Sequence, residues 1–207
     1  MGMITEVKIC GMTRAGDVAA ALEAGADYVG LVFYPKSPRA VTPEAARRIL
    51  DEQTAPCRAV GVFVNESPAE VERIVRACGL YAAQLHGDEA PEAFADFPLR
   101  LWRAVWPGSG TRRIDPDAWR AERYVVDAAV PGLYGGSGVE ADWAAAAALA
   151  AGRPVMLAGG LTPDNVAAAV AAVRPRGVDV SGGVEAAPGR KDHAAVRAFI
   201  AQAKKRS

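Results

Sequence analysis

The sequence predicts an α/β protein, a single-domain (β/α)8 TIM barrel with eight parallel strands over residues 1–207. Short, apolar, β-branched segments alternate with helical segments rich in Ala, Glu and Arg from end to end, and no linker divides them. Apolar strands joined by helical crossovers form parallel sheets, and eight such units in about 200 residues fit a small closed barrel. An open doubly wound sheet is the alternative.

Each element is placed by its local pattern. The expected strands are 7–10, 28–33, 59–64, 82–85, 99–105, 124–127, 155–158 and 178–181. The expected helices are 17–24, 43–51, 68–77, 140–150, 163–173 and 193–203, with only a short helical piece at 114–121 because Pro116 interrupts it. Thr42-Pro43, Ser67-Pro68 and Thr162-Pro163 each place a capping hydroxyl before a proline at the first helical position.

Composition and charge narrow the classes of function. The chain has 24 Lys plus Arg and 24 Asp plus Glu, so no net charge attracts nucleic acid or an anionic membrane. No signal-peptide pattern opens the sequence, and no window approaches the roughly 18 apolar residues of a membrane span. The three cysteines form no CxxC pair. We therefore expect a cytoplasmic protein with reduced thiols and without a nucleic-acid or membrane partner.

Glycine-rich turns follow the last two expected strands. Gly160 lies in the first turn, and Ser181, Gly182 and Gly183 form the second. Backbone N–H groups of such turns converge on anions, and the N-terminus of a short following helix adds partial positive charge. Phosphate sites recur at strands seven and eight of this fold, so we predict a phosphorylated small-molecule ligand there. Tight turns without a ligand are the plainer alternative.

Two strand ends carry candidate acid–base groups. Cys10 ends the first strand and Asp127 ends the sixth, so both face the same rim of the barrel. Burial of an aspartate at such a position favours its protonated form, which makes Asp127 a candidate general acid. Cys10 needs help to become a base, and Lys8, on the same side of its strand, could supply it. Lys8 could equally be a structural cation paired with Asp179.

Other polar residues lie in loops near this rim. Arg39 follows the second strand between stiffening prolines, and its planar guanidinium suits a carboxylate. Gln84 and His86 alternate on the fourth strand and can point toward the ligand, although His86 could instead orient a loop. Asp88-Glu89 is typical of a helix N-terminus. The sequence contains neither an HExxH motif nor a Walker loop, and we expect no metal or cofactor.

Six blocks of sequence, in this order, closely resemble the phosphoribosylanthranilate isomerase family of tryptophan biosynthesis. They are KICGMT at 8–13, GLVFYPKSPR at 30–39, GVFVN at 61–65, QLHG at 84–87, Asp127 with YGGSG at 134–138, and DVSGGVE at 179–185. The resemblance implies an Amadori rearrangement in which N-(5-phosphoribosyl)anthranilate becomes 1-(2-carboxyphenylamino)-1-deoxyribulose 5-phosphate, without a cofactor.

The resemblance also implies roles for single residues. Asp127 matches the general acid, Cys10 the general base, and Arg39 the residue that binds the anthranilate carboxylate. The phosphate loops match at Gly160, Ser181, Gly182 and Gly183, and Lys8, Gln84, His86 and Asp179 complete the expected substrate-binding set. The expected assembly is a monomer or a homodimer.

Two departures from the family pattern concern the phosphate loops. Ala158 and Gly182 stand where serines are common, so two possible hydroxyl donors are missing while the backbone N–H groups stay in place. Two rival functions are considered. The related isomerase of histidine biosynthesis, or a barrel handling both substrates, uses an aspartate where this chain has Cys10. A non-catalytic phosphate-binding barrel would not need Cys10 and Asp127 together.

Overall fold

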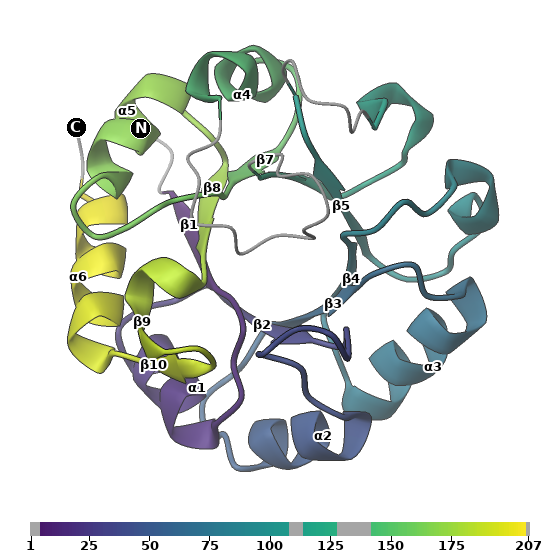
Figure 1. Ribbon diagram of the computed structural model, residues 1–207, viewed down its shortest axis with the longest axis horizontal. Coiled ribbons are helices and arrows are strands. Elements are labelled where there is room, and N and C mark those ends of the chain that lie inside the picture. The colour runs from purple at the N-terminus through teal and green to yellow at the C-terminus, as the bar shows by residue number, and fades with distance from the viewer. Residues whose placement is uncertain (1–4, 108–113, 128–141, 206–207) are drawn as a thin grey trace.

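The computed structural model describes residues 5–107, 114–127 and 142–205, and these form a closed barrel (Figure 1). Neighbouring strands pair in parallel in the order β1 to β8, and β8 pairs back to β1. The strands are β1 (Glu6–Ile9), β2 (Tyr28–Val32), β3 (Ala59–Phe63), β4 (Ala82–Leu85), β5 (Leu101–Val105), β6 (Arg123–Val126), β7 (Val155–Leu157) and β8 (Gly177–Val180). The predicted barrel is confirmed, and the open sheet is excluded.

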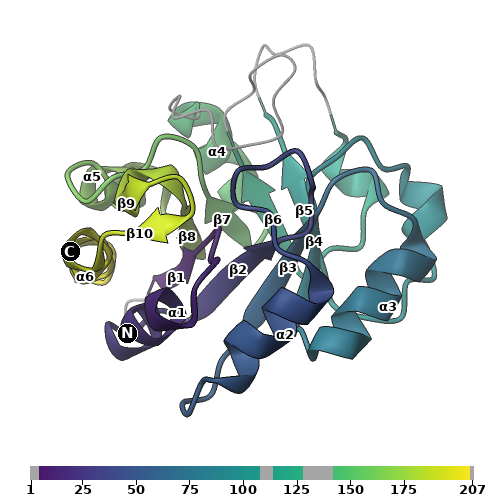
Figure 2. The same cartoon turned by 60° about the horizontal axis from the view of Figure 1, so that its bottom comes forward.

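Helices surround the strands on the outside of the barrel (Figures 1 and 2). They are α1 (Ala15–Glu23), α2 (Pro43–Asp51), α3 (Pro68–Cys78), α4 (Trp143–Ala150), α5 (Val166–Val173) and α6 (His193–Ala203). As expected, the hydroxyls of Thr42 and Ser67 accept the N–H groups of Ala45 and Glu70 and cap α2 and α3. The first residues of the helix expected at 140–150 and the block 134–138 lie outside the described residues.

The helix expected from Pro163 begins three residues later. Asn165 precedes α5, and its side chain accepts the Thr162 N–H at 2.8 Å and donates to the Gly160 carbonyl at 3.0 Å. These two bonds close a turn before the helix starts. The side chain of Asn165 thereby holds the first glycine-rich loop against the start of α5.

Short 3₁₀ helices stand in two of the crossovers. They are η1 (Pro91–Phe94) after β4 and η2 (Pro116–Ala118) after β5, and η2 matches the short piece expected at 114–121. The expected helix N-terminus at Asp88-Glu89 is wrong, because η1 begins only at Pro91. The Glu89 side chain instead points into the protein, where it makes an ion pair with Arg103 of β5.

An unexpected hairpin follows β8. The chain forms the 3₁₀ helix η3 (Gly182–Val184) and then the antiparallel strands β9 (Glu185–Ala187) and β10 (Arg190–Lys191) before α6 begins (Figure 2). The backbone N–H of Lys191 donates to the Asp17 carboxylate of α1 at 3.0 Å. This contact fixes the hairpin beside the first helix, close to the end of β8.

Residues two apart along a strand share a face of the sheet, so alternate side chains of each strand point into the barrel and fill its interior. A separate apolar cluster contains one residue from each of six strands, and Tyr28 and Trp102 pack edge to face there with ring centroids 4.9 Å apart. The members of the cluster on these strands are Tyr28, Val60, Ala82, Trp102, Val125 and Met156. Two residues further along β4, the buried side chain is Gln84. The interior therefore changes from apolar to polar toward the carboxyl ends of the strands.

A buried ion pair holds the loop after β4. Arg103 on β5 is fully buried and donates to Glu89 at 2.9 Å and to the carbonyls of Leu85 and Gly87 at 2.8 and 2.9 Å. The Glu89 carboxylate in turn accepts the N–H of Asn65 after β3 at 2.8 Å. One ion pair therefore ties together the ends of β3, β4 and β5.

Replacing Arg103 with Met should strongly destabilise the protein, because it leaves the buried Glu89 carboxylate without its cation. Breaking a buried pair from one side costs about 3–5 kcal/mol of unfolding free energy. Urea unfolding followed by circular dichroism measures it. Arg76→Ala, which removes an exposed ion pair with Glu72 on α3, is the control and should leave stability nearly unchanged. Equal effects of the two substitutions would show that the buried pair does not hold this rim.

Candidate active site

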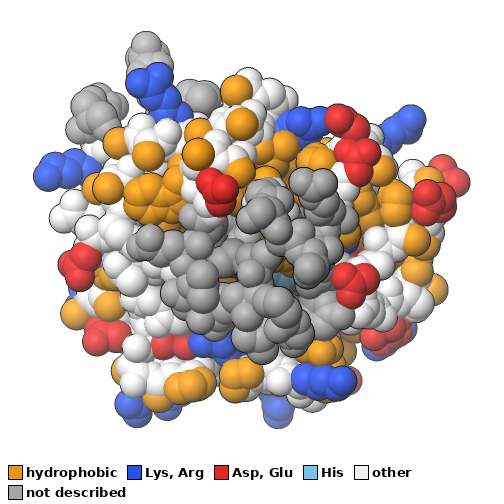
Figure 3. Space-filling model, turned by 45° about the horizontal axis from the view of Figure 1, so that its top comes forward, with side chains coloured by type: hydrophobic (Ala, Val, Ile, Leu, Met, Phe, Trp, Pro, Cys, Tyr) orange, Lys and Arg blue, Asp and Glu red, His pale blue; other side chains and the backbone are white. Residues whose placement is uncertain are grey.

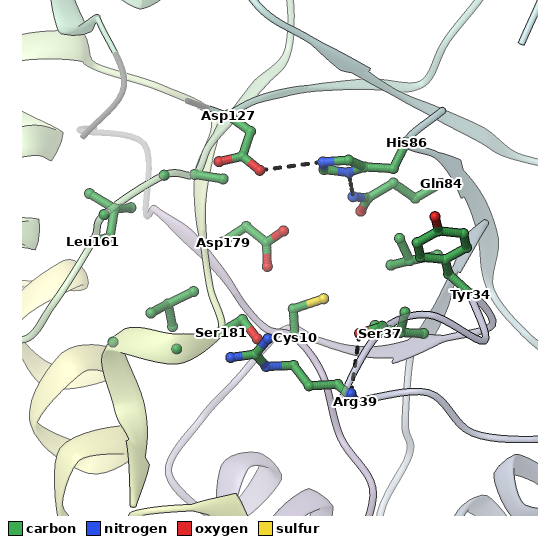
Figure 4. A pocket seen from close by; sticks show the side chains of 18 of the residues that line it. Cys10, Tyr34, Ser37, Arg39, Gln84, His86, Asp127, Leu161, Asp179 and Ser181 are labelled. Carbon is green, nitrogen blue, oxygen red and sulfur yellow. Dashed lines mark hydrogen bonds and ion pairs between the residues drawn. The ribbon is translucent and has the colours of Figure 1, made fainter. Parts of the chain in front are cut away.

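A cavity of about 360 Å³ opens at the carboxyl ends of the strands (Figure 4). Every predicted site residue except Lys8 lines it. These are Cys10, Arg39, Gln84, His86, Asp127, Gly160, Asp179, Ser181, Gly182 and Gly183. Sequence reasoning did not single out its apolar wall, to which Val32, Val62 and Val64 contribute, or Tyr34 above it. The structure thus brings ten of the eleven residues to one place.

Cys10 is the first residue after β1. Its N–H donates to the Val180 carbonyl of β8 at 2.8 Å, which continues the strand pairing by one step. The thiol lies over Gly30 of β2, where an added Cβ would be only 2.6 Å from Sγ. Because any other residue at position 30 would displace the sulfur, the glycine on β2 is what admits the thiol to the cavity.

Lys8 lies below Cys10 and pairs with Asp179. Its Nζ is 2.8 Å from Asp179 Oδ2, and the Lys8 side chain is fully buried. Burial alone would lower the pKa of the Lys8 ammonium, but the charge of Asp179 and the nearby Cys10 group raise it. Lys8 is therefore a cation, and the structural pairing with Asp179 is present together with an interaction with the thiol.

The surroundings of Cys10 favour its protonated form. Burial raises its pKa above the ordinary value, and the Asp179 charge acts in the same direction. Lys8 and, more weakly, Lys191 oppose this rise without cancelling it. The neighbouring cations alone do not make Cys10 a thiolate.

Asp127 is the first residue after β6, and it is 7% exposed, as expected for a group withdrawn from solvent. Its Oδ2 lies 3.3 Å from Nε2 of His86. Gln84 Nε2 lies 3.0 Å from Nδ1 of the same ring (Figure 4). With Gln84 donating to Nδ1, a neutral His86 carries its proton on Nε2, which faces Asp127. His86 therefore links the acid candidate to Gln84.

The two glycine-rich loops touch each other. A Cβ added to Gly183 would lie 2.0 Å from the Leu161 carbonyl oxygen, so the second loop packs directly on the first. Gly160 adopts φ of 64°, in the left-handed region that favours glycine. The Ser181 hydroxyl lines the cavity and has no hydrogen-bond partner within the described part of the chain. The loops thus offer backbone N–H groups and one available hydroxyl to an anion.

Arg39 is held by a protein carboxylate. Its Nε and Nη2 donate to the two oxygens of Glu185 at 2.8 and 2.7 Å. The Nη2 atom is also 3.4 Å from the point where a Gly182 Cβ would stand, so the guanidinium lies beside the phosphate loop. The hydrogen bonds to Glu185 raise the pKa of Arg39. One edge of the guanidinium is thus occupied, which the sequence did not indicate.

Lys191 completes this group of charges. Its buried Nζ lies 2.8 Å from Glu185 Oε1 and 3.2 Å from the Ser181 carbonyl. Burial alone would raise the pKa of Glu185, but the hydrogen bonds from Arg39 and Lys191 lower it. Burial lowers the pKa of Lys191. Pro188-Gly189 is a turn signal from which the hairpin could have been predicted. The ion pairs that Glu185 makes with Arg39 and Lys191 could not have been predicted from it.

Among the described residues, no group of three or more His, Cys, Asp or Glu side chains is placed to hold a metal ion, and no helix is long and apolar enough to cross a membrane. On the face in Figure 3, the visible Lys and Arg side chains are scattered among acidic and apolar ones. The described part of that face therefore presents no gathered basic surface.

Comparison with known proteins is consistent across sequence and structure. The family model of N-(5'phosphoribosyl)anthranilate (PRA) isomerase matches residues 7–202. N-(5'-phosphoribosyl)anthranilate isomerase of Myxococcus xanthus is 48% identical, with 98% of this chain and 97% of the relative covered. The enzyme of Geobacter sulfurreducens is also 48% identical, with 97% and 99% covered.

Solved structures give the same result. Phosphoribosyl anthranilate isomerase of Thermotoga maritima superposes with a TM-score of 0.86 at 39% identity, covering 97% of this chain and 99% of that one. A structure of phosphoribosyl anthranilate isomerase in complex with reduced 1-(o-carboxyphenylamino)-1-deoxyribulose 5-phosphate gives a TM-score of 0.83 at 38% identity with the same coverage. A third describes monomers generated from the dimeric T. maritima enzyme. This chain belongs to the N-(5'-phosphoribosyl)anthranilate isomerase family.

Proposed function

We propose that the cavity carries out the Amadori rearrangement with Asp127 as general acid and Cys10 as general base. Family membership makes the chain an isomerase of tryptophan biosynthesis, which converts N-(5-phosphoribosyl)anthranilate to 1-(2-carboxyphenylamino)-1-deoxyribulose 5-phosphate. The observation that carries the residue assignment is that a thiol and a carboxyl, each directly after a different strand, face one cavity beside two glycine-rich loops (Figure 4). The expected cytoplasmic location fits a biosynthetic step on a charged intermediate.

The cavity offers a place for each part of the substrate. The phosphate accepts hydrogen bonds from the loops at Gly160 and Ser181–Gly183, where hydroxyl donors are few and backbone N–H groups dominate. The anthranilate carboxylate binds the edge of Arg39 that carries Nη1, because Glu185 takes the other edge. The aromatic ring rests on the apolar wall of Val32 and Val62. These contacts place the ribose between Asp127 and Cys10.

The reaction begins at Asp127. The carboxyl gives its proton to the ribose ring oxygen, the bond from C1 to that oxygen breaks, and the nitrogen lone pair forms a C1=N iminium. The Nε2–H of His86, whose nitrogen lies 3.3 Å from Asp127 Oδ2, stabilises the Asp127 carboxylate that forms. Gln84 contributes by fixing the His86 ring.

Cys10 acts in the second step. The iminium cation acidifies the C2 proton and favours the thiolate beside it, so the Cys10 thiol first gives its own proton to water. The thiolate removes that proton, the electrons form the C1=C2 bond of an enolamine, and the nitrogen becomes neutral. The enolamine gains a proton at C1 and loses its hydroxyl proton at C2 to give the ketone. No oxidant or reductant is consumed, and Lys8 keeps Asp179 neutralised throughout.

Purified protein should speed the loss of anthranilate-type fluorescence from freshly made phosphoribosylanthranilate. Cys10→Ala and Asp127→Asn should each lower kcat by about 10²- to 10⁴-fold with little change in KM, because each removes a proton-transfer group. Cys57→Ala is the control and should keep full activity, because Cys57 precedes the amino end of β3 and does not line the cavity. A wild-type protein that binds phosphate without turnover would contradict the isomerase and favour a phosphate-binding barrel.

In the ligand-free protein, Cys10 should react slowly with iodoacetamide at pH 7. Its raised pKa means that the thiolate is scarce at neutral pH and accumulates only as the pH rises above the ordinary thiol value. The alkylation rate against pH, followed by mass spectrometry in a Cys57→Ser, Cys78→Ala background, gives the titration. N-acetylcysteine amide is the reference. A midpoint at or below that of the reference would mean that Lys8 and Lys191 outweigh burial.

Gly183→Ala should weaken phosphate binding at least about tenfold, because the new Cβ collides with the Leu161 carbonyl and pushes the loops apart. The inhibition constant of inorganic phosphate measures this change. Gly152→Ala is the matched control, since an added Cβ there meets nothing within 4 Å. Unchanged phosphate inhibition in Gly183→Ala would place the phosphate elsewhere.

A further inference from the structure

Two residues of the β9–β10 hairpin stand out because the mechanism above does not use them. Glu185 and Lys191 form an ion pair in which the side chains are 5% and 0% exposed. Burying two charges is unfavourable before any attraction between them is counted, and apolar residues of similar size often stabilise a fold as well. The pair therefore calls for a reason other than stability.

Apart from a 3.3 Å bond from the Gly189 N–H to Glu185, the side-chain contacts that this pair makes with other residues lead to substrate-binding elements. Glu185 receives the Nε and Nη2 groups of Arg39, and its Oε1 also receives Lys191. Lys191 in turn donates to the carbonyl of Ser181, the residue directly before η3. The ion pair thus lies between the arginine and the peptide that begins the phosphate loop.

The geometry also decides how Arg39 can bind. A free arginine on a loop has several rotamers and could present either edge of its guanidinium. The bidentate contact with Glu185 fixes the plane of the group and leaves the Nη1 edge, for which no donation to a described residue is observed. Preorganising a charged donor in this way lowers the entropy lost when the substrate binds.

We propose that Glu185 and Lys191 are positioning residues, with Glu185 fixing Arg39 toward the substrate carboxylate and Lys191 fixing the Ser181 peptide of the phosphate loop. This inference rests on the proposed function of the cavity. Neither residue touches the reacting atoms. Their effects should therefore appear in binding and leave the proton-transfer steps largely intact.

Glu185→Gln should raise KM, and the inhibition constant of anthranilate, about ten- to hundredfold, with kcat changed less than about threefold. This is the range expected when a charge-assisted hydrogen bond is lost. Lys191→Met should instead act mainly on the inhibition constant of inorganic phosphate. Arg190→Ala, an exposed neighbour on β10, is the control and should change none of these constants.

A double-mutant cycle separates positioning from general damage. If Glu185 acts through Arg39, Glu185→Gln should add nothing to KM in an Arg39→Met background, because the guanidinium that Glu185 would position is no longer there. A full additional effect in that background would overturn the proposal. So would a Glu185→Gln variant whose melting temperature falls while KM and both inhibition constants stay at wild-type values.

The probes keep the two proposals distinguishable. Anthranilate and phosphate binding can be measured by calorimetry whether or not the protein turns over substrate. Absence of turnover in the wild type would refute the assigned chemistry, whereas unchanged probe binding in both hairpin variants would refute the positioning role alone.

Discussion

The pairing of β1 with β8 is the constraint on which the site depends. Closing the barrel there sets Lys8 opposite Asp179 and Ile9 opposite Val180, and the next step places Cys10 beside Ser181. A shift of one residue would turn every side chain of β1 to the other face of the sheet. The buried ion pair resists such a shift, because it would separate two charges in the interior of the barrel.

From this closure follows the electrostatic character of the cavity. Lys8 is neutralised by Asp179, so the thiol above it stays protonated under the influence of burial. A neutral thiol in the resting protein reacts slowly with electrophiles, and a cation that forms beside it favours loss of its proton and makes it a base. The iminium of the proposed mechanism is such a cation. Arg39, Glu185 and Lys191 contribute to substrate binding more than to proton transfer.

Much of the fold and of the candidate site could be predicted because both depend on local periodicity. Alternation along each strand identifies which residues face the interior, and the carboxyl ends of parallel strands meet at one rim. Their positions in the sequence were therefore enough to predict that Cys10, Asp127 and the glycine loops lie at one rim, and these residues line one cavity. Gly30 is informative for the same reason, since a glycine inside an apolar strand indicates close approach by another group.

What could not be predicted depends on contacts between residues far apart in the chain. Glu185 is 146 residues from Arg39, and Glu89 is 14 residues from Arg103, so no local pattern pairs them. From the sequence alone, Glu89 was interpreted as part of a helix N-terminus, and Arg39 as an arginine whose whole guanidinium could bind a substrate carboxylate. Asn165 shows a smaller failure of the same kind, because its side chain competes with the backbone and delays α5.

The central claim is that Asp127 opens the ring and Cys10 removes the C2 proton. The most direct test is the deuterium isotope effect on kcat with substrate labelled at C2, measured in Asp127→Asn and in Cys10→Ser. We expect a large primary effect in Cys10→Ser, where proton removal limits the rate, and none in Asp127→Asn, where ring opening limits it. The reverse pattern would contradict the assignment of the two residues.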